Sequence, residues 1–198
     1  VLNLFGSAAV AAFSAASKIH MLSEQVAVSF GTAMATYAGQ NYGAGKAGRV
    51  QEGLRKCALA CEAITLGIMV IMTAFGGVMS SWFIDGYHPE VIQQAHLYLF
   101  ISALFYPALT MLFLYRNTLL GLGNGVTPML AGVCELLSRM IGAPVLGHFF
   151  GFTGLCWINP IAWVTASGLL FLSYRKTMRN IRPVDPTVDA SDPNKIMN

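Results

Sequence analysis

The stretch Gly39-Gln-Asn-Tyr-Gly-Ala-Gly45 predicts a tight turn between two helices at a membrane surface. Its three glycines allow the positive φ values and the close backbone approach that end one helix and begin the next. Cations follow at positions 46, 49, 55 and 56, and Lys and Arg gather on the cytoplasmic side of membrane proteins. We therefore expect a structural turn facing the cell interior, formed by Gly39, Gln40, Asn41, Gly43 and Gly45.

The composition indicates an all-α integral membrane protein, with membrane lipid as its surroundings. The chain is 55% hydrophobic and only 11% charged, whereas an ordinary soluble domain carries about a quarter charged residues. The net charge is +3, but the cations cluster at helix ends and form no basic face interleaved with aromatic residues, which argues against nucleic-acid binding. No nucleophile–base set and no metal-ligand spacing is present, so we expect no enzyme, no catalytic residue and no bound metal.

Segment lengths predict the membrane spans, because the hydrocarbon core needs roughly 20 residues of helix. Five full spans are expected at 21–42, 58–84, 95–116, 128–150 and 153–174. The apolar stretch 1–16 reads as the end of a sixth, truncated helix, with Lys18 in the connection that follows it. The transmembrane lobe would then cover residues 1–181. Residues 182–198, rich in proline and aspartate, would form a disordered tail.

The charges of the connections predict the orientation. Connections 43–56 and 175–182 are basic, which places them and the C-terminus in the cytoplasm. The acidic loop 85–90 and the turn 148–154 then face outward. Lys18 is the one cation on the outer side.

Polar residues line one face of the segment 21–42. Gln25, Ser29, Thr32, Thr36 and Gln40 recur every three or four residues and therefore share a helix face. Such groups are costly in hydrocarbon unless they meet partners or water. Interhelical hydrogen bonds and a water-filled cavity are equally open explanations. A second stripe of small residues at 27, 31, 35 and 39 predicts close packing against another helix.

Three carboxylates fall within the predicted spans and are functional candidates by that position alone: Glu24, expected near the outer end of its helix, Glu62 and Glu135. Glu135 precedes Arg139 by four residues, which favours an ion pair within one helix. This pair could be structural, or it could take part in gating or ion coupling.

Two proline positions give local predictions. Tyr106-Pro107 falls in the middle of a span, where proline bends a helix, either as a packing kink or as part of a transport pathway. Thr127 and Pro128 are typical of an N-cap and of the first helical position.

Three motifs resemble those of the C-terminal half of a MATE (multidrug and toxic compound extrusion) transporter. They are the glycine turn with Arg49, the stretch Tyr115-Arg-Asn-Thr-Leu-Leu-Gly-Leu-Gly-Asn124, and Glu135 with Arg139. The chain looks most similar to the DinF-type bacterial branch over residues 1–181. The resemblance implies a multi-pass protein of the bacterial inner membrane with two six-helix lobes. These lobes rock to export organic cations or drugs in exchange for Na⁺ or H⁺. This chain would supply helices seven to twelve, the first truncated, and an N-terminal lobe would be its partner.

The resemblance, together with polarity and spacing, gives expected roles. The substrate cavity would be lined by Gln25, Ser29, Thr32, Thr36, Tyr37 and Tyr106. The gate or coupling group would comprise Glu135, Arg139, Arg116 and Asn117. The NorM-like branch carries an acid near the position of residues 106–110, and none stands there, so the coupling acid is expected outside this chain. No cofactor beyond the coupling ion is expected.

Two other functions fit the same sequence. A flippase for lipid-linked sugars or polysaccharides has a related fold, but its cavity is expected to be more cationic. Here the apolar spans hold only Arg139 away from their ends. A non-transporting scaffold, or a half-size subunit that dimerises, would need only a partner helix on the small-residue stripe.

Overall fold

The computed structural model describes residues 2, 6–84 and 88–181, and these residues form five helices and no strand. The helices are α1 (Gly6–Gly43), α2 (Ala47–Ser81), α3 (Pro89–Leu104), α4 (Tyr106–Gly121) and α5 (Val126–Asn180). The predicted all-α fold is confirmed. The tail 182–198 and part of the acidic loop 85–90 lie outside the described residues.

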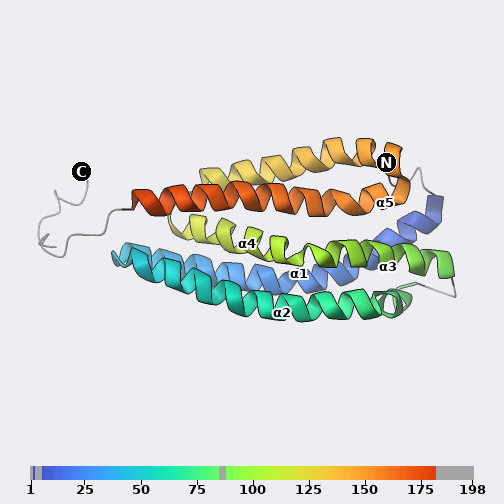
Figure 1. Cartoon of the computed structure of the whole chain (residues 1–198), viewed down its shortest axis with the longest axis horizontal. Coiled ribbons are helices and arrows are strands. Elements are labelled where there is room, and N and C mark those ends of the chain that lie inside the picture. The colour runs from blue at the N-terminus through green and yellow to red at the C-terminus, as the bar shows by residue number, and fades with distance from the viewer. Residues whose placement is uncertain (1, 3–5, 85–87, 182–198) are drawn as a thin grey trace, which may run out of the picture.

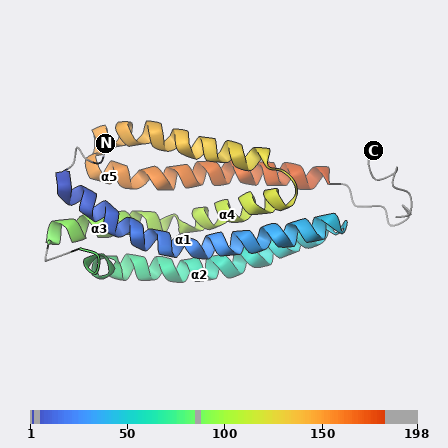
Figure 2. The ribbon, with the colours of Figure 1, turned by 180° about the vertical axis from the view of Figure 1, so that it is seen from behind.

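The helices run side by side along the long axis of the molecule (Figure 1). In both views α2 lies on one side of the bundle and α5, folded back on itself, lies on the other, with α1, α3 and α4 between them (Figure 2). We call the end that holds the connections 44–46 and 122–125 the turn end, and the opposite end, where α5 reverses, the kink end. The last turns of α5, with Arg175 and Arg179, reach the turn end as well. Both basic segments therefore lie together.

The first helix, α1, has no break where one was expected near Lys18. The apolar stretch 1–16 does not end a separate helix, because α1 continues for 38 residues from Gly6 to Gly43. Lys18 lies inside this helix, and its Nζ is 5.7 Å from the centroid of the Phe83 ring beyond the end of α2. A cation over an aromatic face is stabilised without a loop, so the charge at position 18 did not mark a break. The described part of the chain thus contains one helix fewer than expected.

Small residues hold α1 against α4, as the spacing at 27, 31, 35 and 39 predicted. A Cβ added to Gly31 would lie 2.6 Å from Asn117 Nδ2. A Cβ added to Gly121 would lie 2.9 Å from the Ala38 Cβ and would overlap the Ala35 carbonyl. Only glycine permits backbones to approach this closely.

The predicted bend at Tyr106-Pro107 is present. Helix α3 ends at Leu104, α4 begins at Tyr106, and the two axes differ by 53°. Pro107 lies in the first turn of α4, where its missing N–H requires no partner. The segment 95–116 is therefore one bent span and not a straight helix.

Helix α5 is a hairpin of two arms, residues 126–150 and residues 151–180, in agreement with the two spans expected there. Gly151 at the reversal has φ 61° and ψ −143°, a conformation reserved in practice for glycine. The first arm begins at Val126, so Thr127 is not the N-cap. Asn124 Oδ1 instead accepts a hydrogen bond from the Thr127 N–H at 3.2 Å, and Thr127 Oγ1 accepts one from Ser173 Oγ at 2.9 Å, which joins the two arms.

The outer surface is apolar. Large hydrophobic side chains such as Val70 and Phe75 on α2, and Met140 and Ile141 on α5, are more than half exposed. Within the described residues, α2 and α5 are each long and apolar enough to cross a membrane, and α3 with α4 makes a third span if the bent pair is counted as one. Helix α1 does not meet this test.

Candidate functional site

Glu135 on the first arm of α5 bridges two arginines. Its Oε1 accepts a hydrogen bond from Arg116 Nη2 of α4 in a close ion pair. Its Oε2 lies 3.6 Å from Arg139 Nη2, one turn further along the same arm. The Glu135 side chain is only 12% exposed, compared with 24% for Arg116 and 46% for Arg139. The predicted pair of Glu135 and Arg139 is therefore present, and Arg116 completes it from another helix.

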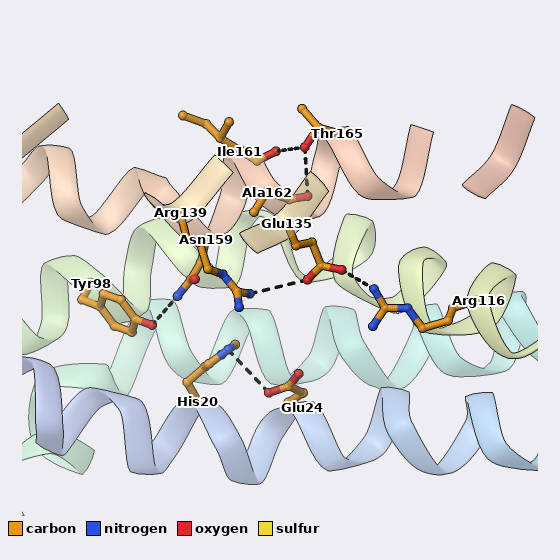
Figure 3. Close-up of polar contacts among 10 residues, drawn as sticks. All are labelled: His20, Glu24, Tyr98, Arg116, Glu135, Arg139, Asn159, Ile161, Ala162 and Thr165. Atoms are coloured by element: carbon orange, nitrogen blue, oxygen red, sulfur yellow. Dashed lines mark hydrogen bonds and ion pairs between the residues drawn. The ribbon is translucent and has the colours of Figure 1, made fainter. Parts of the chain in front are cut away.

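A second pair of ionisable side chains, on α1, faces this triad. His20 Nε2 lies 3.8 Å from Glu24 Oε2. Figure 3 shows the side chains of His20 and Glu24 directed from α1 toward the side where Arg139 and Glu135 descend from α5. The five side chains form one charged cluster between α1, α4 and α5.

His20 connects this cluster to the bend between α3 and α4. Its Nδ1 lies 3.0 Å from the Tyr106 hydroxyl, and Tyr106 is the first residue of α4. The imidazole ring stacks at 5.5 Å on Tyr106 and at 5.2 Å on Trp163 of the second arm of α5. Both His20 and Tyr106 are buried. Tyr106 was expected to line the substrate cavity. It lies instead inside this lobe, where its hydroxyl contacts His20.

A cavity of about 340 Å³ adjoins the cluster on the side of the kink end. It is lined by Phe13 of α1 and by Arg139, Leu155 and Asn159 of α5, among others. Asn159 Nδ2 donates to the Tyr98 hydroxyl of α3 at 3.0 Å (Figure 3).

The polar stripe of α1 points away from the other helices. Gln25, Ser29, Thr32, Thr36 and Gln40 are all exposed. The hydroxyls of Ser29, Thr32 and Thr36 donate to backbone carbonyls four residues earlier, at 2.8, 3.0 and 3.4 Å. Each hydroxyl is thereby satisfied within its own helix and can still accept a hydrogen bond from outside. Within the described chain the stripe forms no hydrogen bonds to other helices. Of the two explanations left open, interhelical hydrogen bonding within this lobe is therefore wrong.

Tyr37 and Asn117 lie apart from both groups and serve helix packing. The Tyr37 hydroxyl donates to the Arg49 carbonyl at 3.3 Å, and its ring lies where a Cβ on Gly53 would be. Asn117 Nδ2 donates to the Phe113 carbonyl at 2.9 Å and contacts Gly31. Asn117 was expected beside Arg116 in the gate, but consecutive helical residues point in different directions, and Asn117 faces α1 instead.

A turn at residues 44–46 connects α1 to α2. Of the residues expected to form it only Gly45 does so, because α1 continues through Gly39, Gln40, Asn41 and Gly43. Gly45 has φ 71°, and the Gly45 N–H donates to the Tyr42 carbonyl at 2.9 Å. Asn41 makes two hydrogen bonds at this end of α1. Its carbonyl accepts from the Lys46 N–H at 2.8 Å, and its Nδ2 donates to the Tyr37 carbonyl at 2.9 Å. A Cβ added to Gly39 would lie 3.4 Å from the carbonyl oxygen of Gly121. Gln40 is exposed.

Sequence reasoning missed the aromatic and amide part of the site. None of His20, Tyr98, Asn159 and Trp163 was singled out from the sequence. A signal was available for His20, since it precedes Glu24 by one helical turn on the same face. The contacts of Tyr98 and Trp163 join residues far apart in sequence, and no local pattern indicates them.

A bundle with apolar outer helices around a partly buried charged cluster defines a multi-pass membrane protein. The sequence model of the MatE family matches residues 1–145. The chain therefore belongs to the MATE family of transporters.

Comparison with solved structures supports the same fold. The chain is similar to the MATE transporter VcmN of Vibrio cholerae in its bent form, with a TM-score of 0.75 and 23% sequence identity. The match covers 91% of this chain and 41% of the Vibrio chain, so this chain spans about two fifths of the length of that transporter. No curated protein sequence matches it significantly.

Proposed function

We propose that this chain forms one lobe of a multidrug antiporter that exports organic cations or drugs in exchange for Na⁺ or H⁺. The lobe packs against an N-terminal lobe in the bacterial inner membrane, with the turn end and the C-terminus in the cytoplasm. Transport proceeds by alternating access, in which the two lobes rock and expose a shared cavity to one side of the membrane at a time.

The exposed polar stripe of α1 is the observation that carries this proposal. A helix face with five polar residues is costly against lipid, yet these five residues are exposed among the residues that the structure describes. The adjacent faces of α2 and α5 are apolar and suited to lipid contact. The stripe therefore forms the wall of the cavity between the lobes, where water and substrate meet Gln25, Ser29, Thr32 and Thr36.

The bridge of Glu135 to Arg116 and Arg139 acts as the gate. It joins α4 to the first arm of α5, so separating these helices requires breaking an ion pair that is largely removed from water. Breaking a buried pair is expensive because it leaves an uncompensated charge. Because the ion pair is either formed or broken, it favours two distinct arrangements of α4 and the first arm of α5 over intermediate ones.

Dye efflux from whole cells tests this role. In the complete transporter, Glu135→Gln and Arg116→Ala should each abolish most of the energised efflux of ethidium. The charge-exchanged double variant Arg116→Glu with Glu135→Arg should recover part of it, because the pair re-forms in the opposite sense. Glu52→Gln is the matched control, since Glu52 loses only an exposed contact of 2.7 Å with Lys56.

Unchanged efflux in both single variants, at expression levels equal to the wild type, would show that the bridge is not the gate. Absence of ethidium efflux in the wild type under both Na⁺ and H⁺ gradients would refute the multidrug function itself.

A further inference from the structure

The final turns of α5 carry a cluster of positive charge at the turn end. Arg175, Lys176 and Arg179 are all exposed, and their spacing places them on one side of the helix. In both views this end of α5 extends past the start of the first arm (Figure 1 and Figure 2). The three cations, with Leu172 and Asn180, line a groove of about 310 Å³, which we call the basic groove.

Within the described residues these three charges form no ion pair. The second arm of α5, residues 151–180, contains no Asp and no Glu. The ion pairs of the described chain involve other cations, as in the contact of Lys56 with Glu52 at the same end of the molecule. The basic groove therefore presents three positive charges to a ligand from outside the lobe, which favours an anion.

Arg175 is held in place for such a ligand. Its guanidinium carbon lies 5.7 Å from the centroid of the Phe171 ring, and that ring packs at 5.5 Å against Tyr115 of α4. A guanidinium group is planar and donates two parallel hydrogen bonds to a phosphate. Because the group is already oriented on an aromatic face, it loses less conformational freedom when it binds one.

The basic groove lies at the depth of the lipid phosphates. The part of α5 expected to span the membrane, 153–174, has a helical length of about 33 Å, and the hydrocarbon layer is about 30 Å thick. Arg175 is the next residue along the helix. The cations thus begin where the hydrocarbon layer ends.

An apolar strip, formed by Ile161, Val164, Gly168 and Leu172, leads from the groove into the hydrocarbon layer. These residues are three or four positions apart and share a face of α5 with the three cations. Leu172 is 67% exposed, and Val164 and Ile161 are nearly half exposed. A Cβ added to Gly168 would meet nothing within 4 Å. The strip therefore has room for an acyl chain directly above a site for a phosphate.

We propose that the basic groove and the apolar strip bind an anionic phospholipid of the leaflet at the turn end. The lipid phosphate contacts Arg175, Lys176 and Arg179, and one acyl chain lies along the strip. A headgroup such as glycerol leaves the negative charge of the phosphate uncompensated, whereas choline cancels it. The three cations therefore select anionic lipids over zwitterionic ones. This site goes beyond the antiport function and does not depend on it.

The turn end provides a matched control for the general attraction of cations to anionic membranes. Lys46, Arg49 and Arg55 are exposed cations at the same end of the molecule. Arg49 and Arg55 are six residues apart in α2, so they do not share a helix face. Replacing these three residues removes the same charge from the same surface without altering the basic groove.

Native mass spectrometry of the purified, complete transporter tests the site, with added phosphatidylglycerol or phosphatidylcholine of identical acyl chains. A basic residue near an anionic lipid contributes roughly a fivefold factor in binding, so three contribute about a hundredfold. The triple variant Arg175→Gln, Lys176→Gln and Arg179→Gln should therefore lose one bound phosphatidylglycerol. The control variant Lys46→Gln, Arg49→Gln and Arg55→Gln should keep it. An unchanged number of bound phosphatidylglycerol molecules in the first variant, or an equal loss in both, overturns the inference.

Photochemical labelling locates the lipid in the wild-type transporter. Phosphatidylglycerol with a diazirine in one acyl chain should form adducts within residues 161–172, and unlabelled phosphatidylglycerol should compete more effectively than phosphatidylcholine. Adducts confined to other helices overturn the inference.

The tail of this chain is the alternative anion for the groove. It contains Asp185, Asp189 and Asp192, which lie outside the described residues. Replacing all three by asparagine should leave phosphatidylglycerol binding unchanged. A gain of one bound phosphatidylglycerol in that variant would mean that the tail fills the groove, and would overturn the inference. None of these measurements records transport, so each outcome leaves the antiport proposal to its own test.

Discussion

The contact between α1 and α4 should depend on the absence of a single methyl group at position 121. Gly121 closes α4 at the turn end, and its Cα faces the backbone of α1. In Gly121→Ala the new Cβ would overlap the carbonyl oxygen of Ala35 and lie 2.9 Å from the Cβ of Ala38. Neither neighbour is a flexible side-chain end, so the helices themselves must move apart.

Two opposing effects set the magnitude. Replacing glycine by alanine in a helix gains about 1 kcal/mol of intrinsic helix propensity. Forcing one extra carbon into a closely packed contact costs about 1–3 kcal/mol. The net effect of Gly121→Ala alone is therefore small to moderate. A comparison with a glycine that has no neighbour separates the two contributions.

Gly132 and Gly168 on the two arms of α5 provide that comparison. Both are helical, and an added Cβ would meet nothing within 4 Å at either position. Gly132→Ala and Gly168→Ala thus report the propensity gain without the overlap. Relative to them, Gly121→Ala should be less stable by about 1–3 kcal/mol. The assay is reversible unfolding by sodium dodecyl sulfate in mixed micelles, followed by circular dichroism. Equal unfolding free energies for all three variants would refute the close contact between α1 and α4.

Two further predictions use the same unfolding assay. Thr65 of α2 and Thr110 of α4 are buried with their hydroxyls 3.1 Å apart, so Thr65→Val and Thr110→Val should each cost roughly 1 kcal/mol. In the double variant the coupling between them should be about 0.6 kcal/mol, and strict additivity would count against the hydrogen bond. Gly151→Ala should destabilise by about 1–3 kcal/mol, because its φ of 61° with ψ of −143° strains any side chain; a stability equal to that of Gly132→Ala would contradict the hairpin geometry.

Local signals in the sequence predicted much of the fold. Gly45 stands in the turn after α1 with a positive φ, and Pro107 stands at the bend between α3 and α4, because both residue types act on their own backbone. The ion pair of Glu135 and Arg139 followed from a spacing of four residues. Hydrophobic length located every later span, and the two arms of α5 match the segments expected at 128–150 and 153–174.

The errors came from contacts that the sequence does not display. Lys18 suggested a loop because a charge interrupts an apolar run, but the Phe83 ring, 65 residues further along, accommodates it. That misplaced boundary also moved Glu24 toward a helix end. The pairing of His20 with Tyr106 joins residues 86 positions apart, and it depends on the packing of four helices. Side-chain partners of this kind require the tertiary fold before they can be named.

The unbroken length of α1 affects how motion passes through the lobe. A helix of 38 residues is about 57 Å long, whereas the hydrocarbon layer is about 30 Å thick. A tilt of such a helix about its centre would displace its two ends in opposite directions. Glu24 and His20 lie near that centre and would move least. The neighbouring span is interrupted at Phe105, between α3 and α4, whereas α1 is continuous. A tilt of α1 would therefore move groups near both membrane surfaces at once.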